Sequence, residues 1–120
     1  MVLASTESFE QHKNRQGAER TSLTVSMIIP TKNRPGELLQ TLQSIAVQAR
    51  LPDELIIIDQ SAVNIEEEIQ RLVGSCPGLT LKYRWMPEVA GVVQARIRGV
   101  GEATSDVVFF VDDDITLETE

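Results

Sequence analysis

Three successive carboxylates, Asp112, Asp113 and Asp114, are the residues of this chain best suited to chemistry. They directly follow the apolar run Val107 to Val111, which predicts a buried strand. Two like charges about 4 Å apart repel by roughly 1 kcal/mol in water and roughly 4 kcal/mol at an effective dielectric constant of 20, so a divalent cation is a natural counter-charge. Side chains alternate along extended backbone, so we expect Asp112 and Asp114 to share one side while Asp113 faces the other. The pattern predicts two oxygen ligands for Mn²⁺ or Mg²⁺.

From Leu23 onward, short β-branched runs alternate with stretches of helical periodicity, which is typical of successive β-α-β units. The predicted fold is α/β and Rossmann-like, with mostly parallel strands and alternating helices. Two strands read as almost unbroken apolar runs, as expected when helices cover both faces of a sheet. The four predicted strands are 24–29, 54–58, 79–83 and 106–111.

Three helices are predicted between these strands, each with an apolar stripe at three- and four-residue steps. The first begins at Pro35, the second carries three glutamates in its first turn and stops at Gly74, and the third covers 92–103. The residues expected to face the core are Leu38, Leu39, Leu42, Ile45 and Ala46, then Ile65, Ile69, Leu72 and Val73, and finally Val93, Ile97 and Val100.

Right-handed crossovers bring the carboxyl ends of parallel strands to one edge of the sheet, where ligands of open α/β sheets bind. The segments expected at this rim are 30–34, 59–62, 86–91 and 112–114. The residues of these four segments therefore indicate which ligands this edge of the sheet could bind.

Residues 27–34 (MIIPTKNR), residues 55–61 (LIIIDQS) and the late Asp triplet together resemble family 2 glycosyltransferases of the GT-A fold. The resemblance extends from about Ser22 to the last residue. It implies that residues 23–120 are the nucleotide-sugar-binding front part of an inverting glycosyltransferase, truncated after its D-x-D motif. The implied donor is a nucleoside-diphosphate sugar, the implied metal is Mn²⁺ or Mg²⁺ on Asp112 and Asp114, and the implied setting is polysaccharide biosynthesis.

The resemblance also assigns donor contacts. It places Pro30, Thr31, Arg34 and Asp59 around the base and ribose, and Asp112 and Asp113 against the donor. A carboxylate can accept a hydrogen bond from the base or ribose, and a guanidinium can meet phosphate. The structural alternatives are a turn for Asp59 and a solvated charge for Arg34.

Residues 91–99 (GVVQARIRG) are similar to the segment that lies near the diphosphate in this family, which gives Arg96 a phosphate-binding role. A surface salt bridge is the alternative for Arg96. The sequence departs from the family pattern at Ile97, where Asn is usual, and at Gln60, where a second acid is common. These departures bear on base selectivity and sugar contacts.

The implied reaction is direct displacement at the anomeric carbon, which needs a general base for the acceptor hydroxyl. In this family that base is an Asp or Glu well beyond the D-x-D motif, so we expect it beyond Glu120 and assign neither Glu118 nor Glu120. The acceptor, whether glycan, lipid-linked or small molecule, stays open. With further strands missing, the strand 106–111 would be an exposed edge prone to self-association, and the 120-residue chain would be marginally stable and without turnover.

Composition excludes several other classes. The formal net charge of −7 argues against binding to nucleic acid or to anionic lipid, and no apolar run approaches the roughly 18 residues that cross a bilayer. Membrane association would therefore need missing regions, and a cytoplasmic location is predicted. Residues 1–22 are interpreted as a flexible polar tail with a solvated His12, and Cys76, the single cysteine, as a structural or exposed thiol.

Two alternatives remain. Residues 112–116 (DDDIT) resemble the D-x-D-x-T signature of haloacid dehalogenase-type phosphatases, but that motif normally follows the first strand of its domain, whereas three β-α units precede it here. The other alternative is a truncated, non-catalytic nucleotide-binding module. It shares the predicted fold, which alone does not decide function.

Overall fold

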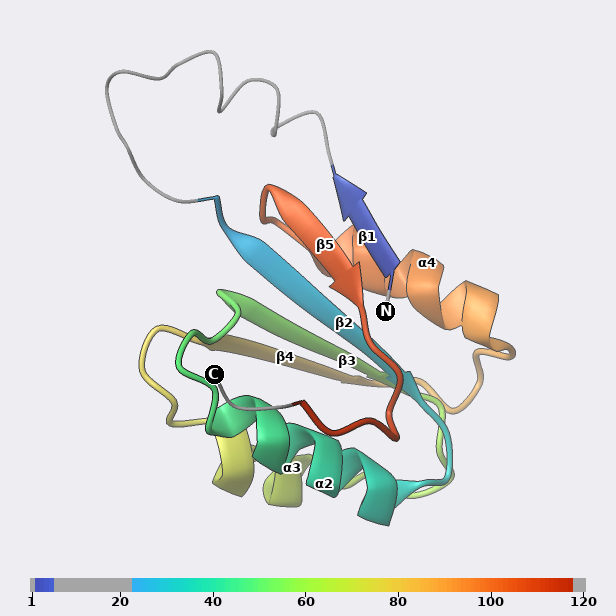
Figure 1. Ribbon diagram of the computed structural model, residues 1–120. Helices are drawn as coiled ribbons and strands as arrows, with labels where there is room; N and C mark the ends of the chain where they lie inside the picture. Colours follow the sequence, from blue (N-terminus) through green and yellow to red (C-terminus); the bar gives the residue numbers. More distant parts are fainter. Residues whose placement is uncertain (1, 6–22, 118–120) are drawn as a thin grey trace.

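The computed structural model describes residues 2–5 and 23–117, which form one twisted sheet with helices on both faces (Figure 1). α2 and α3 cover one face, and α4 covers the other. The strands are β1 (Val2–Ser5), β2 (Val25–Thr31), β3 (Glu54–Asp59), β4 (Thr80–Trp85) and β5 (Val107–Phe110), and the helices are α2 (Pro35–Ala46), α3 (Glu66–Val73) and α4 (Val92–Glu102).

The strand order across the sheet is β1-β5-β2-β3-β4. The four strands β5, β2, β3 and β4 are parallel, and Ile28 of β2 stands between Phe110 of β5 and Ile56 of β3. Every strand and helix expected within residues 23–111 is present, with ends that differ by one or two residues. The predicted α/β fold with a parallel sheet is confirmed.

β1 corrects two expectations. Residues 1–22 were predicted to be a flexible tail, yet Val2–Ser5 form a strand that pairs antiparallel with β5. Residues 1 and 6–22, including His12, lie outside the described part of the chain. The edge of β5 is therefore covered rather than exposed, because the backbone of Val2–Ser5 pairs with it.

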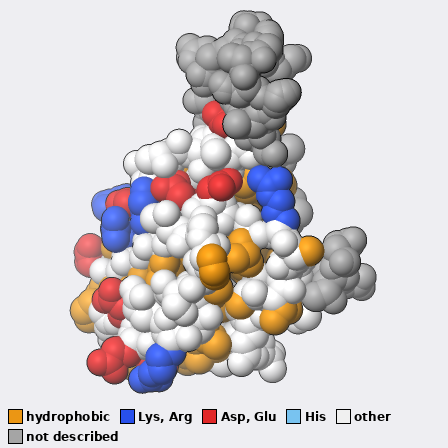
Figure 2. All heavy atoms as spheres, turned by 90° about the vertical axis from the view of Figure 1, so that its left-hand side faces the viewer, with side chains coloured by type: hydrophobic (Ala, Val, Ile, Leu, Met, Phe, Trp, Pro, Cys, Tyr) orange, Lys and Arg blue, Asp and Glu red, His pale blue; other side chains and the backbone are white. Residues whose placement is uncertain are grey.

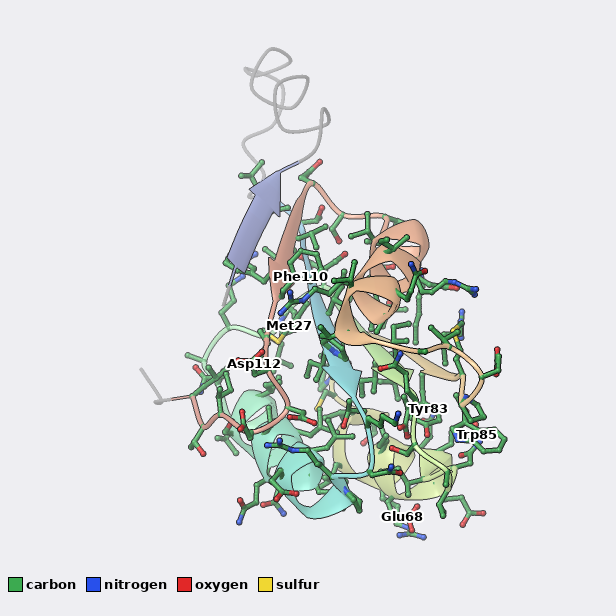
Figure 3. All side chains as sticks on the ribbon, turned by 90° about the vertical axis from the view of Figure 1, so that its right-hand side faces the viewer. Met27, Glu68, Tyr83, Trp85, Phe110 and Asp112 are labelled. Atoms are coloured by element: carbon green, nitrogen blue, oxygen red, sulfur yellow. The ribbon has the colours of Figure 1, made fainter. Side chains whose placement is uncertain are left out.

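The core consists of two apolar layers separated by the sheet. All six residues of β3 are buried, and their side chains alternate between the layers. The first layer holds Met27 with the inner faces of α2 and α3, while Phe110 packs in the second layer with α4 (Figure 3). Among the predicted inward positions of α2 and α3, the fully buried ones are Leu38, Leu42, Ile45, Ile69 and Val73.

α4 does not face the sheet as predicted. Val93, Ile97 and Val100 are 62%, 56% and 47% exposed, while Ala95 and Gly99 are buried. A Cβ atom at Gly99 would lie 2.4 Å from Cγ2 of Ile28, so only glycine permits this approach of helix to strand. The prediction was wrong because a stripe of small residues, rather than the branched ones, faces β2.

Glu54 is the first residue of β3 and lies at the amino ends of the parallel strands, away from their carboxyl ends. Its buried carboxylate accepts hydrogen bonds from Ser26 Oγ at 2.6 Å and from Thr104 N and Oγ1 at 2.9 Å, and it pairs with Lys82 Nζ at 2.8 Å. Burial alone would raise the pKa of Glu54, but the donors Lys82, Ser26 and Thr104 outweigh it and lower the pKa to about 2. Glu54 thereby ties β2, β4 and the end of α4 to β3.

The surface carries charges of both signs. On the face seen in Figure 2, basic and acidic side chains form small groups, some of them directly next to each other, and there is no continuous basic area. Within residues 2–5 and 23–117, no helix has the length and apolar character needed to cross a bilayer.

The same substitution at two isoleucines tests the orientation of α4. We expect Ile69→Val to lower the free energy of unfolding by about 0.5–1.5 kcal/mol, because a buried methylene is lost. Ile97→Val should change it by less than about 0.5 kcal/mol, because the side chain is exposed. Urea unfolding followed by circular dichroism measures both. Equal losses at the two positions would contradict the exposed placement of Ile97.

The Glu54 network predicts a pH dependence of stability. A carboxylate with a lowered folded-state pKa stabilises fully above its unfolded value of 4.5 and loses this contribution as pH falls toward about 2. The contribution is on the order of 3 kcal/mol, and Glu54→Gln should remove most of this pH dependence. Urea midpoints measured between pH 7 and pH 3 test it. Glu67→Gln is the matched control and should retain the wild-type profile, because Glu67 is exposed and its ion pair among the described residues is with Arg71.

Candidate active site

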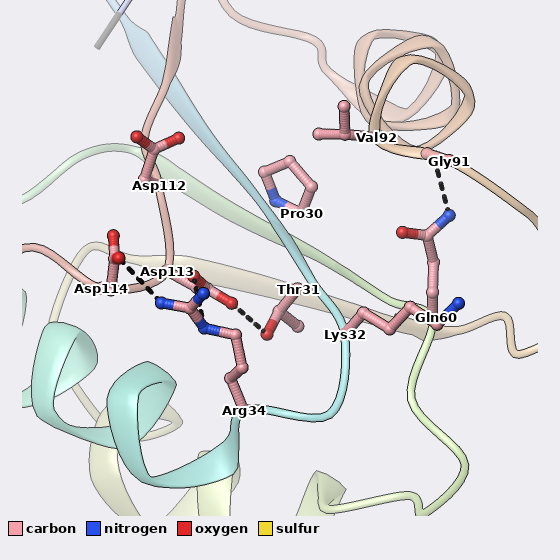
Figure 4. Close-up of a pocket in the computed structure, with 10 residues that line it drawn as sticks. All are labelled: Pro30, Thr31, Lys32, Arg34, Gln60, Gly91, Val92, Asp112, Asp113 and Asp114. Carbon is pink, nitrogen blue, oxygen red and sulfur yellow. Dashed lines mark hydrogen bonds and ion pairs between the residues drawn. The ribbon is translucent and has the colours of Figure 1, made fainter.

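A cleft of about 470 Å³ opens at the carboxyl ends of the parallel strands (Figure 4). Its walls come from the loops after β2, β3 and β5 and from the start of α4, which are the rim segments expected from the sequence. The lining residues are Pro30, Thr31, Lys32, Arg34, Gln60, Gly91, Val92, Asp112, Asp113 and Asp114. Segments far apart in the chain therefore converge as predicted.

The loops after β2 and β3 are hydrogen-bonded to each other. Gln60 N donates to Thr31 O at 2.8 Å, Asn33 N donates to Ser61 Oγ at 2.6 Å, and Ala62 N donates to Asn33 Oδ1 at 3.1 Å. Asn33 adopts a left-handed backbone with φ of 57°, which asparagine tolerates better than most residues. These hydrogen bonds hold the two loops together and thereby fix the direction in which the side chains of Thr31 and Arg34 point.

The Asp triplet is held by the carboxylate that points inward. Asp113 is buried, and its Oδ2 accepts a hydrogen bond from Thr31 Oγ1 at 2.8 Å. Asp112 and Asp114 are exposed, so burial alternates along the triplet as predicted. One carboxylate thus anchors the loop while two remain accessible to a ligand.

α2 fixes the backbone that follows the triplet. Thr41, buried on α2, places its hydroxyl 2.9 Å from the carbonyl oxygen of Asp113 and 2.7 Å from that of Ile115. One turn further along the helix, Ser44 Oγ accepts a hydrogen bond from Leu117 N at 3.1 Å. The polar residues on the inner face of α2 thus position the acidic segment, and the apolar pattern of that helix gave no sign of this role.

Arg34 is the basic residue in contact with the triplet. Its Nη2 lies 2.7 Å from Asp114 Oδ2, and its Nε lies 3.5 Å from Asp113 Oδ1. The hydrogen bond with Asp114, together with the charges of both aspartates, raises the pKa of Arg34 further above its ordinary value. Lys32 lines the same cleft, so two cationic side chains stand beside three acidic ones.

Asp59 lies outside the main cleft, unlike most of the residues predicted to contact the glycosyl donor. It is buried and lines a separate pocket of about 310 Å³ that shares Thr31 with the main cleft. Its Oδ1 accepts a hydrogen bond from Ser61 N at 2.9 Å, and its Oδ2 accepts one from the Tyr83 hydroxyl. Burial and the Asp59 carboxylate raise the pKa of Tyr83. The carboxylate therefore already stabilises the turn after β3 and the end of β4.

Gln60 connects this turn to the start of α4. Its Nε2 donates to the carbonyl oxygens of Val89 and Gly91, both at 2.9 Å. Gly91 has a φ of 88°, a conformation that glycine adopts without strain, and the N–H groups of the first turn of α4 bring partial positive charge beside the cleft. Gln60, Lys32 and Val92 were not predicted as site residues, although all three belong to or adjoin the expected rim segments.

Arg96 lies outside the residues that line the cleft. Its guanidinium carbon is 5.6 Å from the centroid of the Phe110 ring, which precedes Asp112 along the strand direction (Figure 3). Its Nε is buried and makes no hydrogen bond. The side chain thus packs between α4 and β5, behind the rim.

The protein oxygen atoms available in the cleft limit how a divalent cation can be bound. Within the described ranges, no group of three or more His, Cys, Asp or Glu side chains is arranged to bind a metal ion. Asp112 and Asp114 supply two accessible carboxylates, and Mg²⁺ commonly binds one or two carboxylates together with substrate phosphates. The residues therefore fit a cation shared with a phosphate ligand rather than one held by protein alone.

Comparison with known sequences identifies one family. The model of glycosyl transferase family 2 matches residues 26–120. A curated relative from Bacillus subtilis (strain 168), the uncharacterized glycosyltransferase YwdF, is 32% identical over 92 residues, which are 77% of this chain and 33% of that protein.

Solved structures give the same fold. The mannosyltransferase PcManGT of Pyrobaculum calidifontis, in complex with GDP-Man and Mn²⁺, matches with a TM-score of 0.66 at 21% identity, over 91% of this chain and 34% of that one. TarS 1-349 of S. aureus in complex with UDP matches with a TM-score of 0.64 at 26% identity, over 77% and 28%. Glucosyl-3-phosphoglycerate synthase of Mycobacterium tuberculosis, with Mn²⁺, UDP and glucosyl-3-phosphoglycerate, matches with a TM-score of 0.55 at 25% identity, over 76% and 33%.

These relatives are GT-A glycosyltransferases, so the expected GT-A fold is confirmed. The chain spans 33% of the length of the curated relative and 34% of the mannosyltransferase. A phosphatase would not account for a match that begins at residue 26, in β2, and continues through the Asp triplet. Together, the family match, the curated relative and the shared fold show that the chain belongs to glycosyl transferase family 2.

Proposed function

We propose that this chain binds the nucleoside-diphosphate part of a glycosyl donor, together with Mn²⁺ or Mg²⁺, and forms the donor-binding region of an inverting glycosyltransferase. The observation that carries the proposal is the cleft in which Asp112 and Asp114 face Lys32, Arg34 and the start of α4. Such a cleft offers carboxylates for a cation and positive groups for phosphate oxygens.

The related structures support the ligand class. The mannosyltransferase contains GDP-Man and Mn²⁺, TarS contains UDP, and the phosphoglycerate enzyme contains UDP and Mn²⁺. Both uracil and guanine nucleotides occur among these relatives, so we do not assign the base. The cation, when bound, would neutralise charge that develops on the departing diphosphate.

The residues of this chain act mainly by positioning. The hydrogen bond from Thr31 to Asp113 fixes the acidic loop, and Thr41 fixes the backbone beyond it. Lys32 and the start of α4 at Gly91 and Val92 line the cleft across from the Asp triplet (Figure 4), where the ammonium group and helix N–H groups would meet a diphosphate. The phosphate role predicted for Arg96 is not supported by its place over Phe110, and the nucleoside role of Asp59 stays a prediction.

The general base stays a prediction beyond Glu120, and Glu118 and Glu120 lie outside the described residues. A role in polysaccharide biosynthesis and a cytoplasmic location also stay predictions. A non-catalytic nucleotide-binding module would use the same cleft, so binding is the property to test first.

Calorimetric titration of the chain with UDP, dTDP and GDP, each with and without MnCl₂, tests donor binding. We expect one nucleotide to bind in the presence of Mn²⁺ and to bind more weakly without it, by about tenfold or more, because Asp112 and Asp114 would hold a cation that neutralises the charge of the diphosphate. Asp114→Asn should remove the Mn²⁺-dependent gain. Asp106→Asn, at the far end of β5, is the matched control and should bind like the wild type. No binding of any of the three nucleotides with Mn²⁺ would refute the proposal.

Thr31→Val tests the anchoring of the acidic loop. The substitution keeps the shape of the side chain but leaves Asp113 buried without its hydroxyl donor, so we expect a loss of about 1–3 kcal/mol in the free energy of unfolding. Mn²⁺-dependent nucleotide binding should weaken in parallel. Thr80→Val, on the exposed start of β4, serves as the control. Wild-type stability and binding in Thr31→Val would show that this hydrogen bond does not position the loop.

A further inference from the structure

Asp114, one of the two carboxylates that fit a cation, already has a cationic partner. Arg34 Nη2 lies 2.7 Å from Asp114 Oδ2, while the guanidinium Nε lies 3.5 Å from Asp113 (Figure 4). No other basic group is seen to pair with the triplet in the part of the chain that the structure describes. Lys32 lines the cleft without an ion pair to these carboxylates among the described contacts.

The contact between Arg34 and Asp114 can be exchanged. Both side chains are about half exposed, at 44% and 48%, and an ion pair of this kind contributes little to stability because water competes for both charges. The rest of the triplet is held independently, since Asp113 is fixed by Thr31 and its backbone by Thr41. Arg34 can therefore leave Asp114 without loss of the loop structure.

A divalent cation on Asp114 would stand next to the guanidinium that already pairs with this carboxylate. They carry like charges, and at such close range they oppose each other. Arg34 therefore opposes binding of the cation alone for as long as the guanidinium stays beside Asp114. A diphosphate supplies a new partner, because guanidinium pairs well with phosphate oxygens.

We propose that Arg34 is an internal counter-ion that the cation displaces from Asp114, and that the released guanidinium then pairs with the diphosphate of the nucleotide. This inference rests on the proposed function and adds how cation binding and nucleotide binding depend on each other. Arg34 weakens the binding of the cation alone and strengthens the binding of the cation with nucleotide. The cation and nucleotide consequently bind with positive coupling, and each raises the affinity for the other by the same factor.

Mn²⁺ affinity without nucleotide is the decisive measurement, followed through the electron paramagnetic resonance signal of free Mn²⁺. We expect Arg34→Gln to bind MnCl₂ about two- to fivefold more tightly than the wild type, the range that corresponds to an exposed ion pair. Lys32→Gln removes the same charge from the same cleft without breaking an ion pair, and it should change Mn²⁺ affinity less. In an Asp114→Asn background, Arg34→Gln should have a clearly smaller effect, because the ion pair with Asp114 is gone and the longer contact with Asp113 is what remains.

For nucleotide binding, we expect Arg34→Gln to have the opposite effect, a loss of affinity. With saturating MnCl₂, Arg34→Gln should bind the preferred nucleotide of UDP, dTDP and GDP more weakly than the wild type, so that the coupling between cation and nucleotide shrinks. Arg34→Lys should recover part of both effects. Circular dichroism of each variant confirms the fold, which we expect to be retained because Arg34 is exposed.

Unchanged or weaker Mn²⁺ binding in Arg34→Gln, or an equal gain in Lys32→Gln, would overturn the inference. An undiminished effect of Arg34→Gln in the Asp114→Asn background would also overturn it. If the wild type binds none of the three nucleotides, the proposed function fails, yet the nucleotide-free Mn²⁺ comparison still decides whether Arg34 competes with the cation.

Discussion

The buried hydrogen bond from Thr31 to Asp113 joins the two strand ends on which the candidate site depends. It forms because β2 and β5 run parallel with Ile28 beside Phe110, so that the chain beyond β5 continues along the end of β2 and Asp113 comes level with Thr31. Val111 N donates to Ile28 O at 2.9 Å and carries the pairing up to the triplet. A shift of one residue would turn Asp113 outward and Asp112 or Asp114 inward, and the accessible carboxylates would change with it.

The electrostatics of the molecule are divided between the two ends of the sheet. At one end, Glu54 is buried and fully paired, so its charge serves only the fold. At the other end, Asp112 and Asp114 stay exposed, and only Asp114 is partly neutralised, by Arg34. The chain has a net charge of −7, and the exposed carboxylates of its cleft lie next to two cationic side chains, Arg34 and Lys32. These two side chains can balance the charge of an incoming phosphate.

Most of the fold and the location of the site followed from the sequence, because apolar runs and strand-end rules depend on local pattern. The orientation of α4 did not, since hydrophobic periodicity favours Val93 and Ile97, whereas close contact with Ile28 requires Gly99. The role of Asp59 was equally hidden, because its partner Tyr83 lies on another strand. Pairing of β1 with β5 was missed because a four-residue strand carries too little pattern to be predicted.

The placement of β1 also sets the demands on the segment that joins it to β2. Ser5 and Val25 both stand beside Val107, one on each side of β5. Two strand spacings, about 10 Å, therefore separate the ends that residues 6–24 must connect, a gap that three or four extended residues can bridge. The connection is much longer than its span requires. In a flexible loop, each halving of the length lowers the entropic cost of closure by about 0.6 kcal/mol, so length beyond the span costs the pairing of β1 with β5 little.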